Sequence, residues 1–320
     1  MILRTEGLTK EFSLGLRRKR IYAVQDLELQ VQQGEIFGFV GPNGAGKTTT
    51  IKMLMGLIFP TRGRAFIFDK PIPTNESKRR IGYLPENPAF PEFLTGRELL
   101  TYMGRLADVA GADLKSRCDS LLERVGLGTS GDIAIRKYSK GMVQRLGIAQ
   151  ALVGDPSFLV LDEPMSGLDP IGRKEMRDLI LELKAAGKTI FFSTHILPDV
   201  ETLCERVGVI LFGRLRDVGR LGDLLSARVH SVEATVVLPT PNRELLGPGR
   251  IIAEEGERLT VVYDSEGPAD TAVRAVLAAG GRLLSLTPHR ENLEGFFMRR
   301  LEEGRARASE SEKHGRPLSA

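Results

Sequence analysis

The feature that most constrains this chain is a glycine-rich segment from Phe39 to Thr50, which begins within the largely apolar stretch Ile36–Val40. Its spacing, Gly-x-x-x-x-Gly-Lys-Thr, fits a loop between a strand and a helix whose backbone N–H groups surround the phosphates of a nucleotide. Glycines let such a loop curl, and the N-terminus of the following helix adds partial positive charge. The pattern predicts a nucleoside triphosphate site, and the residues expected to contact the nucleotide are Gly41, Pro42, Asn43, Gly44, Ala45, Gly46, Lys47, Thr48 and Thr49.

Two side chains of this segment have defined roles in such loops. Lys47 is placed to reach the β- and γ-phosphates, and the hydroxyl of Thr48 can ligate Mg²⁺. The alternative interpretation is a glycine-rich turn before a helix, with no ligand. A phosphate loop by itself does not separate kinases, GTPases, motors and transport ATPases, so the class of enzyme must come from downstream residues.

Two carboxylates follow the wholly apolar run Phe158–Leu161. Such a run is typical of a central parallel strand covered on both faces, and open α/β sheets place their ligands at the carboxyl ends of these strands. Asp162 suits the Mg²⁺ carboxylate of a phosphate-loop ATPase. Glu163 could orient the attacking water or accept its proton. An ordinary acidic cap and turn remains the alternative at this point.

Downstream motifs narrow the class. Tyr138–Arg145 resembles the signature loop of ATP-binding cassette (ABC) ATPases, and Ser166–Pro170 resembles their D-loop. His195, after the strand-like Thr189–Ser193, is similar to their switch histidine. Glu86 ends a segment in the place of the Q-loop, and Phe12 stands where the family has an aromatic residue that stacks on adenine. These elements occur in family order across residues 1 to about 220.

The resemblance implies a site shared by two protomers. Ser139, Lys140, Gly141 and Met142 would face the γ-phosphate of ATP held by the opposite protomer, and Asp169 would join the nucleotide contacts. Independently of the family, Ser139 can cap the helix that follows it and leave N–H groups available for an anion. The implied catalytic residues are Glu163 and His195, the implied cofactors are ATP and Mg²⁺, and the implied metal ligands are Thr48, Glu86 and Asp162.

Four positions depart from the usual pattern or stay open. Glu86 replaces glutamine, so it can hold Mg²⁺ or its water but cannot donate an amide hydrogen bond. The signature loop carries Lys140 and Met142, as in ATPase subunits of ABC-2 type export systems, which the chain resembles. Phe12 could instead pack in the core, and the nearby Tyr22 competes for its role.

Composition bounds the setting. No apolar run approaches the ~20 residues of a membrane helix, and no signal-peptide pattern opens the chain. The two cysteines, Cys118 and Cys204, at no motif spacing, favour a reducing cytoplasm. For the basic run Arg17–Arg20, a solvated loop between the first two strands is favoured over contact with anionic lipid headgroups. No motif for nucleic acid is present.

The expected fold class is α/β: a phosphate-loop NTPase core of the ABC type with an inserted helical subdomain, plus a small C-terminal α+β domain. We expect the nucleotide domain at 1–225, its helical subdomain at about 92–140, the accessory domain at 226–301 and a disordered tail at 302–320. Helices are predicted from the capping box at Thr95 to Leu106, from Lys140 to Val153, and from Pro170 to Gly187. One strand is expected over Val24–Val31 and three in the accessory domain.

The resemblance implies an ATP-hydrolysing subunit that energises an ABC transporter, an exporter by its subfamily. It would act as a homodimer or paired cassette beneath an integral membrane permease, on the cytoplasmic face of the membrane, without nucleic acid. One alternative is a soluble ABC ATPase acting on ribosomes or DNA, although neither a second cassette nor a long coiled coil is present. The other is a non-catalytic regulatory cassette, against which the intact Lys47, Asp162, Glu163 and His195 argue.

Overall fold

The computed structural model describes residues 1–14, 19–225, 229–238, 242–290, 293–300 and 302–303. The chain divides into two compact units, Met1–Leu221 and Gly222–Ala320, so the division falls four residues before the expected boundary at 225. Residues 17 and 18 of the basic run and nearly all of the expected tail, 304–320, lie outside the described residues. The other half of the basic run, Lys19 and Arg20, begins a strand and not a loop. Each unit has its own hydrophobic core.

The first sheet of the larger unit is antiparallel. Its strand order is β2-β1-β5-β6, with β3 paired to β1. The strands are β1 (Leu3–Leu14), β2 (Lys19–Leu27), β3 (Gln30–Val31), β5 (Arg62–Ile67) and β6 (Lys70–Pro71). The prediction of a single strand over Val24–Val31 was wrong. The segment is divided into β2 and β3, which residues 28 and 29 separate, and Asp26 near the end of β2 has a left-handed φ of 46°.

The second sheet positions the site. Its order is β11-β10-β4-β9-β8-β7, and all neighbouring pairs are parallel except β10 with β11. The strands are β4 (Ile36–Val40), β7 (Ile81–Leu84), β8 (Phe158–Asp162), β9 (Thr189–Thr194), β10 (Arg206–Leu211) and β11 (Arg214–Arg220). Every residue of β4, β8 and β9 is buried, which explains why each strand has a run of consecutive apolar residues and no alternation of apolar and polar ones.

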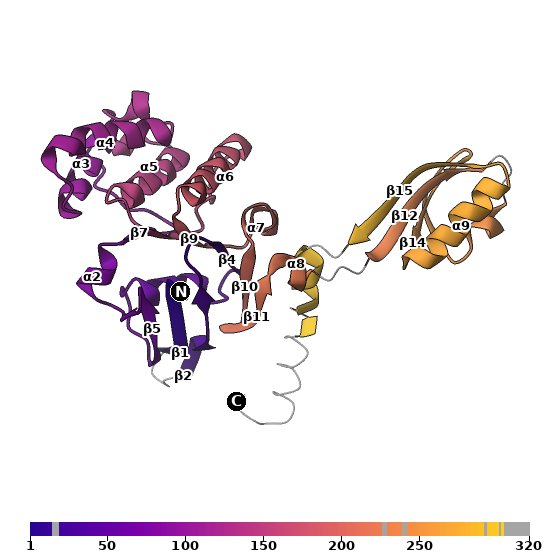
Figure 1. The fold of residues 1–320 in the computed structure, drawn as a ribbon, viewed down its shortest axis with the longest axis horizontal. Coiled ribbons are helices and arrows are strands. Elements are labelled where there is room, and N and C mark those ends of the chain that lie inside the picture. Colours follow the sequence, from indigo (N-terminus) through magenta and orange to yellow (C-terminus); the bar gives the residue numbers. More distant parts are fainter. Residues whose placement is uncertain (15–18, 226–228, 239–241, 291–292, 301, 304–320) are drawn as a thin grey trace. The chain divides into compact units, whose positions relative to one another are not determined.

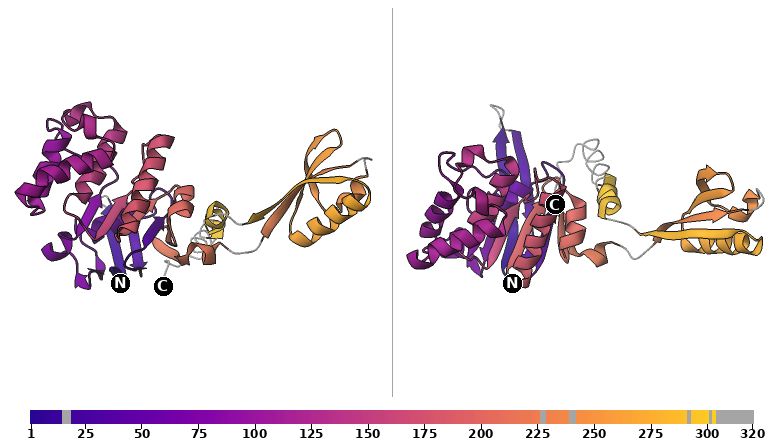
Figure 2. Two further views of the ribbon diagram at one scale, coloured as in Figure 1. Left: turned by 45° about the horizontal axis from the view of Figure 1, so that its top comes forward. Right: turned by 90° about the horizontal axis from the view of Figure 1, so that it is seen from above.

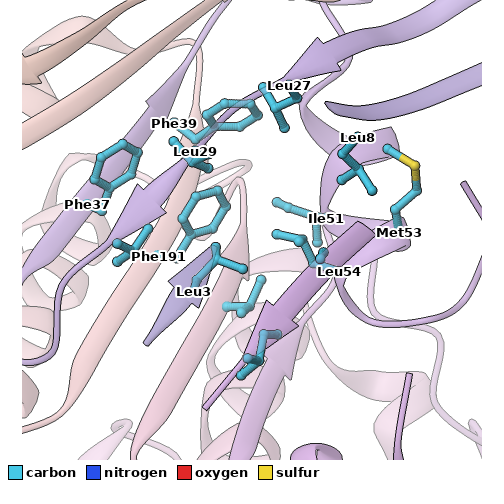
Figure 3. Close-up of a cluster of buried hydrophobic side chains, with 14 of the residues drawn as sticks. Leu3, Leu8, Leu27, Leu29, Phe37, Phe39, Ile51, Met53, Leu54 and Phe191 are labelled. Atoms are coloured by element: carbon cyan, nitrogen blue, oxygen red, sulfur yellow. The ribbon is translucent and has the colours of Figure 1, made fainter. Parts of the chain in front are cut away.

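The core of the larger unit lies where the two sheets and helix α1 (Lys47–Leu54) meet (Figure 3). Phe37 and Phe191, from the neighbouring strands β4 and β9, stack with ring centroids 5.8 Å apart. Further helices pack on the parallel sheet: α2 (Asn75–Lys78), α6 (Pro170–Ala185) and α7 (Leu197–Leu203). The short α8 (Leu221–Leu224) follows β11, where the two units divide.

The helical segment expected at about 92–140 contains two helices, which group with the next helix of the chain beside the parallel sheet (Figures 1 and 2). The three are α3 (Gly96–Leu106), α4 (Gly111–Arg124) and α5 (Lys140–Leu152), with the 3₁₀ turns Gly128–Ser130 and Ile135–Lys137 between the last two. The predicted capping box is confirmed, since the side chains of Thr95 and Glu98 each bond the other's backbone N–H. The predicted start and end of α5 and α6 also agree within two residues.

The smaller unit is an antiparallel sheet of order β13-β14-β12-β15 with α9 along one face (Figure 2). Its elements are β12 (Val229–Val237), the 3₁₀ turn Arg243–Leu246, β13 (Arg250–Glu255), β14 (Arg258–Tyr263), α9 (Glu266–Ala278) and β15 (Arg282–Arg290). Residues 293–300 are helical. The prediction missed β13, an edge strand whose side chains are almost all exposed and therefore lack alternation.

Candidate active site

The glycine-rich loop joins β4 to α1 and borders an open cavity of about 240 Å³. Gly44 and Gly46 have left-handed φ values of 79° and 108°, which side-chain-bearing residues rarely adopt. A Cβ at Gly41 would collide with the carbonyl oxygen of Ile210, and one at Gly46 with that of Ala23. The residues that line the cavity are Ala23, Asn43, Gly44, Gly46, Lys47, Thr48, Thr49, Glu86 and Glu163.

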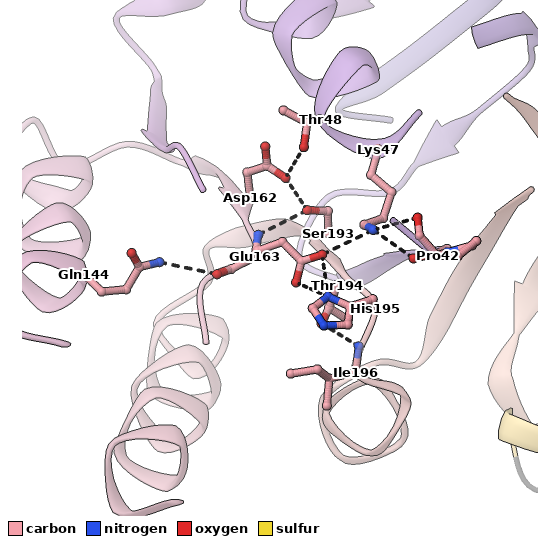
Figure 4. Close-up of polar contacts among 11 residues, drawn as sticks. Pro42, Lys47, Thr48, Gln144, Asp162, Glu163, Ser193, Thr194, His195 and Ile196 are labelled. Carbon is pink, nitrogen blue, oxygen red and sulfur yellow. Dashed lines mark hydrogen bonds and ion pairs between the residues drawn. The ribbon is translucent and has the colours of Figure 1, made fainter. Parts of the chain in front are cut away.

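The ammonium of Lys47 lies at the centre of this loop. It donates to the carbonyl oxygen of Gly41 at 2.8 Å and contacts that of Pro42 at 3.3 Å. It also lies 3.3 Å from the Glu163 carboxylate, and both side chains are buried (Figure 4). Loop, lysine and acidic edge therefore form one cluster, although they come from segments more than 100 residues apart.

Asp162, at the end of β8, is a fully buried carboxylate. Its Oδ1 accepts from the hydroxyl of Ser193 at 2.5 Å and from that of Thr48 at 3.4 Å. Its Oδ2 is buried without a hydrogen-bond partner among the described residues. Burial raises the pKa of Asp162, against the hydrogen bonds from Ser193 and Thr48, which lower it. An unpartnered carboxylate oxygen beside a threonine hydroxyl fits the hard oxygen ligands that Mg²⁺ requires.

Glu163 has an unusual backbone conformation, and its carboxylate contacts both Lys47 and His195. Its φ is 50°, the left-handed region, and its N–H donates to the backbone oxygen and the hydroxyl of Ser193, both at 3.2 Å. Both carboxylate oxygens lie 3.0 Å from Nδ1 of His195, the residue that follows β9 (Figure 4). The carboxylate is buried, whereas the histidine is 45% exposed and can face both the carboxylate and solvent.

The signature segment lies apart from the phosphate loop. Ser139 caps α5 as predicted, accepting from the N–H of Met142 at 3.2 Å, and both Ser139 and Lys140 are exposed. A Cβ at Gly141 would meet only ordinary contacts, the nearest being 3.4 Å from Leu168. None of the described residues that line the phosphate-loop cavity comes from 138–145. Asp169 caps α6, accepting from the N–H of Gly172 at 2.8 Å.

Phe12 is the predicted nucleotide contact with the least structural support. It is 42% exposed on β1, opposite Ile21 on β2, and the Lys10 ammonium lies 5.1 Å from its ring centroid. Among the described residues it is not part of the cavity lining. Tyr22 is similarly exposed, so the choice between the two aromatic rings stays open.

The site prediction missed two residues, Ser193 and Gln144. Ser193 is paired with Asp162 in the parallel register of β8 and β9, so the rule that neighbouring parallel strands end together could have found it. Gln144 is buried and donates to the backbone oxygens of Glu163 and Pro164. No local sequence signal connects a glutamine on one helix with a turn 19 residues further on.

A phosphate loop after β4, a carboxylate pair after β8 and a histidine after β9 define a P-loop ATPase of the ATP-binding cassette class. The sequence profile of the family described as ABC transporter matches residues 24–166. An ABC transporter ATP-binding protein of Synechocystis is 40% identical over 306 residues, which is 94% of this chain and 85% of that protein. The chain belongs to this family, as one of its ATP-binding, ATP-hydrolysing proteins.

Two further relatives match about two thirds of the chain or slightly more. The bacitracin transport ATP-binding protein of Bacillus licheniformis is 47% identical over 217 residues, 67% of this chain and 68% of that protein. The fluoroquinolones export ATP-binding protein of Mycobacterium tuberculosis is 41% identical over 230 residues, which is 71% of this chain and 73% of that protein.

Solved structures share the fold. The ATP-binding subunit of an ABC transporter, 30% identical, aligns with a TM-score of 0.64 over 70% of this chain and 92% of its own. A dimeric ATP-binding cassette in a post-hydrolysis state with ADP and Pi, 23% identical, also aligns with a TM-score of 0.64, over 69% of this chain and 99% of its own. Within the described part of the chain, the structure contains no helix of the length and apolar character that spanning a bilayer requires.

Proposed function

We propose that Glu163 activates the water that hydrolyses ATP and that His195 holds this carboxylate and the water in place. The observation that carries the proposal is the single cluster formed by Lys47, Glu163 and His195 beside the phosphate-loop cavity. A carboxylate next to the γ-phosphate can accept the proton of the attacking water, and the lysine ammonium balances charge on the phosphates. The products are ADP and inorganic phosphate.

Mg²⁺ is part of the proposal. Thr48, Asp162 and Glu86 would hold it, since the first two are in contact and the third lines the same cavity. When bound, the ion neutralises charge on the β- and γ-phosphate oxygens. Ser193 keeps Asp162 oriented through its 2.5 Å hydrogen bond. Glu86 in place of glutamine leaves the ligand chemistry intact, because a carboxylate oxygen is also a hard ligand.

We propose further that two copies complete each site by pairing head to tail. Ser139 and Gly141 would then meet the γ-phosphate held by the other copy. This is supported by the separation of the signature segment from the phosphate-loop cavity and by the exposure of Ser139 and Lys140 at the start of α5. ATP between two such surfaces favours the closed pair, and hydrolysis removes that attraction, so the cycle delivers a closing and opening motion.

The motion would drive an integral membrane permease from its cytoplasmic side, in the direction of export. The support is the similarity to the bacitracin transport and fluoroquinolones export ATP-binding proteins, which covers 67% and 71% of this chain. Nothing in the cassette itself selects a transported compound, because the permease would bind it.

The test is Glu163→Gln in the full chain. The amide keeps the shape of the side chain but cannot take a proton, so turnover should fall by at least about 100-fold, typical of a lost general base. ATP affinity, measured by calorimetry, should stay within a few fold. Lys47→Ala is the contrasting variant, because it should weaken ATP binding itself. Turnover near the wild-type rate in Glu163→Gln would refute the assignment of the base.

A further inference from the structure

A buried glutamine connects the signature helix to the acidic edge of the sheet. Gln144, on the second turn of α5, is 1% exposed. Its amide nitrogen lies 3.4 Å from the backbone oxygen of Glu163 (Figure 4). It also lies 3.2 Å from the backbone oxygen of Pro164. Because both neighbours are carbonyl oxygens, which only accept, the group that faces them must be the NH₂ end of the amide.

The backbone that Gln144 contacts is held away from its preferred conformation. A left-handed φ at a residue with a side chain costs on the order of 1 kcal/mol or more, and such residues persist only where their surroundings fix them. At Glu163 the N–H is fixed by Ser193, and the carbonyl accepts from the N–H of Ser166 at 3.0 Å and from Gln144. The direction in which the carboxylate leaves the chain depends on these contacts.

We infer that Gln144 is a positioning residue for Glu163, and that it ties the place of that carboxylate to the signature helix. The inference rests on the proposed function, in which Glu163 is the base. Ser139 begins α5 and Gln144 lies five residues further on, a rise of about 7.5 Å along the helix. Displacement of the helix start by a ligand is therefore transmitted to the turn that orients Glu163.

The alternative role for Gln144 is structural, since any buried glutamine satisfies nearby carbonyls and fills space. The two roles differ in what they change. A space-filling role affects the folded state as a whole, so stability and nucleotide binding fall together with turnover. A positioning role affects kcat and leaves the KM for ATP, the ATP affinity and the thermal midpoint close to wild type.

The experiment compares Gln144→Met and Gln144→Glu in the full chain. Methionine keeps the length and volume without a donor, and glutamate keeps the shape but presents an acceptor to two carbonyls. We expect kcat to fall about tenfold in Gln144→Met, the effect of losing one buried hydrogen bond at the reacting group, and further in Gln144→Glu. KM for ATP should change less than twofold in both.

The matched control is Gln150→Met, on the same helix but bordering a different cavity, and it should keep wild-type kcat. Two results would overturn the inference: kcat within twofold of wild type in Gln144→Met, or parallel losses of kcat, ATP affinity and thermal midpoint. Glu163→Gln is measured alongside. If that variant keeps turnover, the proposed base is wrong; if it loses turnover while Gln144→Met does not, only the inference fails.

Discussion

At the scale of residues, two neighbouring residues at the end of β8 each have a feature that costs folding free energy. Asp162 is a buried carboxylate with one unpartnered oxygen among the described residues, and Glu163 has a left-handed backbone. Both features place negative charge beside the phosphate loop, where the proposed chemistry needs it. Such sites commonly lower stability in exchange for activity.

Asp162→Asn should therefore stabilise the protein at neutral pH. Burial raises the pKa of Asp162 in the folded chain above its unfolded value, so the folded state binds more protons between these two values. Stability then falls as pH rises through that window, and at pH 7 the ionised carboxylate carries the full penalty. Urea unfolding at neutral pH, with EDTA and without nucleotide, should show a higher midpoint for the variant.

The pH series supplies the control. The advantage of Asp162→Asn over wild type should shrink as the pH is lowered below the folded pKa, where the native carboxyl is also neutral. An advantage that stays constant across the series would point to a cause other than charge burial. Mg²⁺-dependent turnover should be lost in the variant at every pH.

At the scale of elements, an ion pair joins the helix after the D-loop-like segment to the helix after His195. Arg177 on α6 lies 3.1 Å from Asp199 on α7, whose side chain is 3% exposed. Arg177→Met would leave a buried carboxylate without its partner, at a cost of about 2 kcal/mol of unfolding free energy. Urea unfolding measures this loss.

Arg124→Met is the matched control for that ion pair. Arg124 pairs with Glu182 across two well-exposed side chains, 37% and 63% exposed, so its loss should cost less than about 1 kcal/mol. Equal losses in the two variants would mean that burial of Asp199 does not set the strength of the ion pair between α6 and α7.

Local signals predicted elements well where one short stretch of sequence determines them. The capping box at Thr95 and the Asp169–Pro170 start of α6 are satisfied within three residues of themselves, and both are confirmed. Strand β13 was missed because an exposed edge strand has no apolar alternation. The link from Gln144 to Glu163 could not be predicted either, since packing between α5 and the sheet, and not local sequence, brings the two together.

At the scale of the whole molecule, Gly141 provides a test of pairing. In the Glu163→Gln background, ATP should drive the chain from monomer to dimer in sedimentation velocity. Adding Gly141→Asp should abolish that dimer, because a carboxylate would face the γ-phosphate at short range and like charges repel. ATP should still bind, since within one copy a Cβ at this position meets only ordinary contacts.

Gly111→Asp serves as the control for charge at a helix start. Gly111 begins α4, and a Cβ there meets nothing within 4 Å. When Gly111→Asp is added to Glu163→Gln, dimerisation with ATP should match that of Glu163→Gln alone. The shared site would be refuted if the Glu163→Gln, Gly141→Asp double variant dimerises with ATP and if Gly141→Asp alone turns over ATP at the normal rate.

The smaller unit should fold without the cassette. Its core draws on residues between 232 and 283, and its sheet is complete from β12 to β15. A fragment of residues 229–290 is therefore expected to unfold cooperatively on heating, with a stability of only about 2–5 kcal/mol because a core this small buries limited area. Circular dichroism and amide dispersion by NMR would detect it, and a spectrum without dispersion would show that the unit depends on the rest of the chain.

The contrast between the phosphate loop and the acidic edge has an evolutionary consequence. Gly41 and Gly46 are required by the fold itself, because any side chain would strike a neighbouring backbone carbonyl. Asp162 is required only by chemistry, since burial of its charge opposes folding, whereas the Glu163 carboxylate also partners the buried Lys47. A duplicated copy released from selection for turnover would gain stability by losing the Asp162 carboxylate, whereas loss of these glycines would damage it. In lineages where such copies have drifted, an intact phosphate loop is therefore a poor guide to activity, and Asp162 at the end of β8 is the position to inspect.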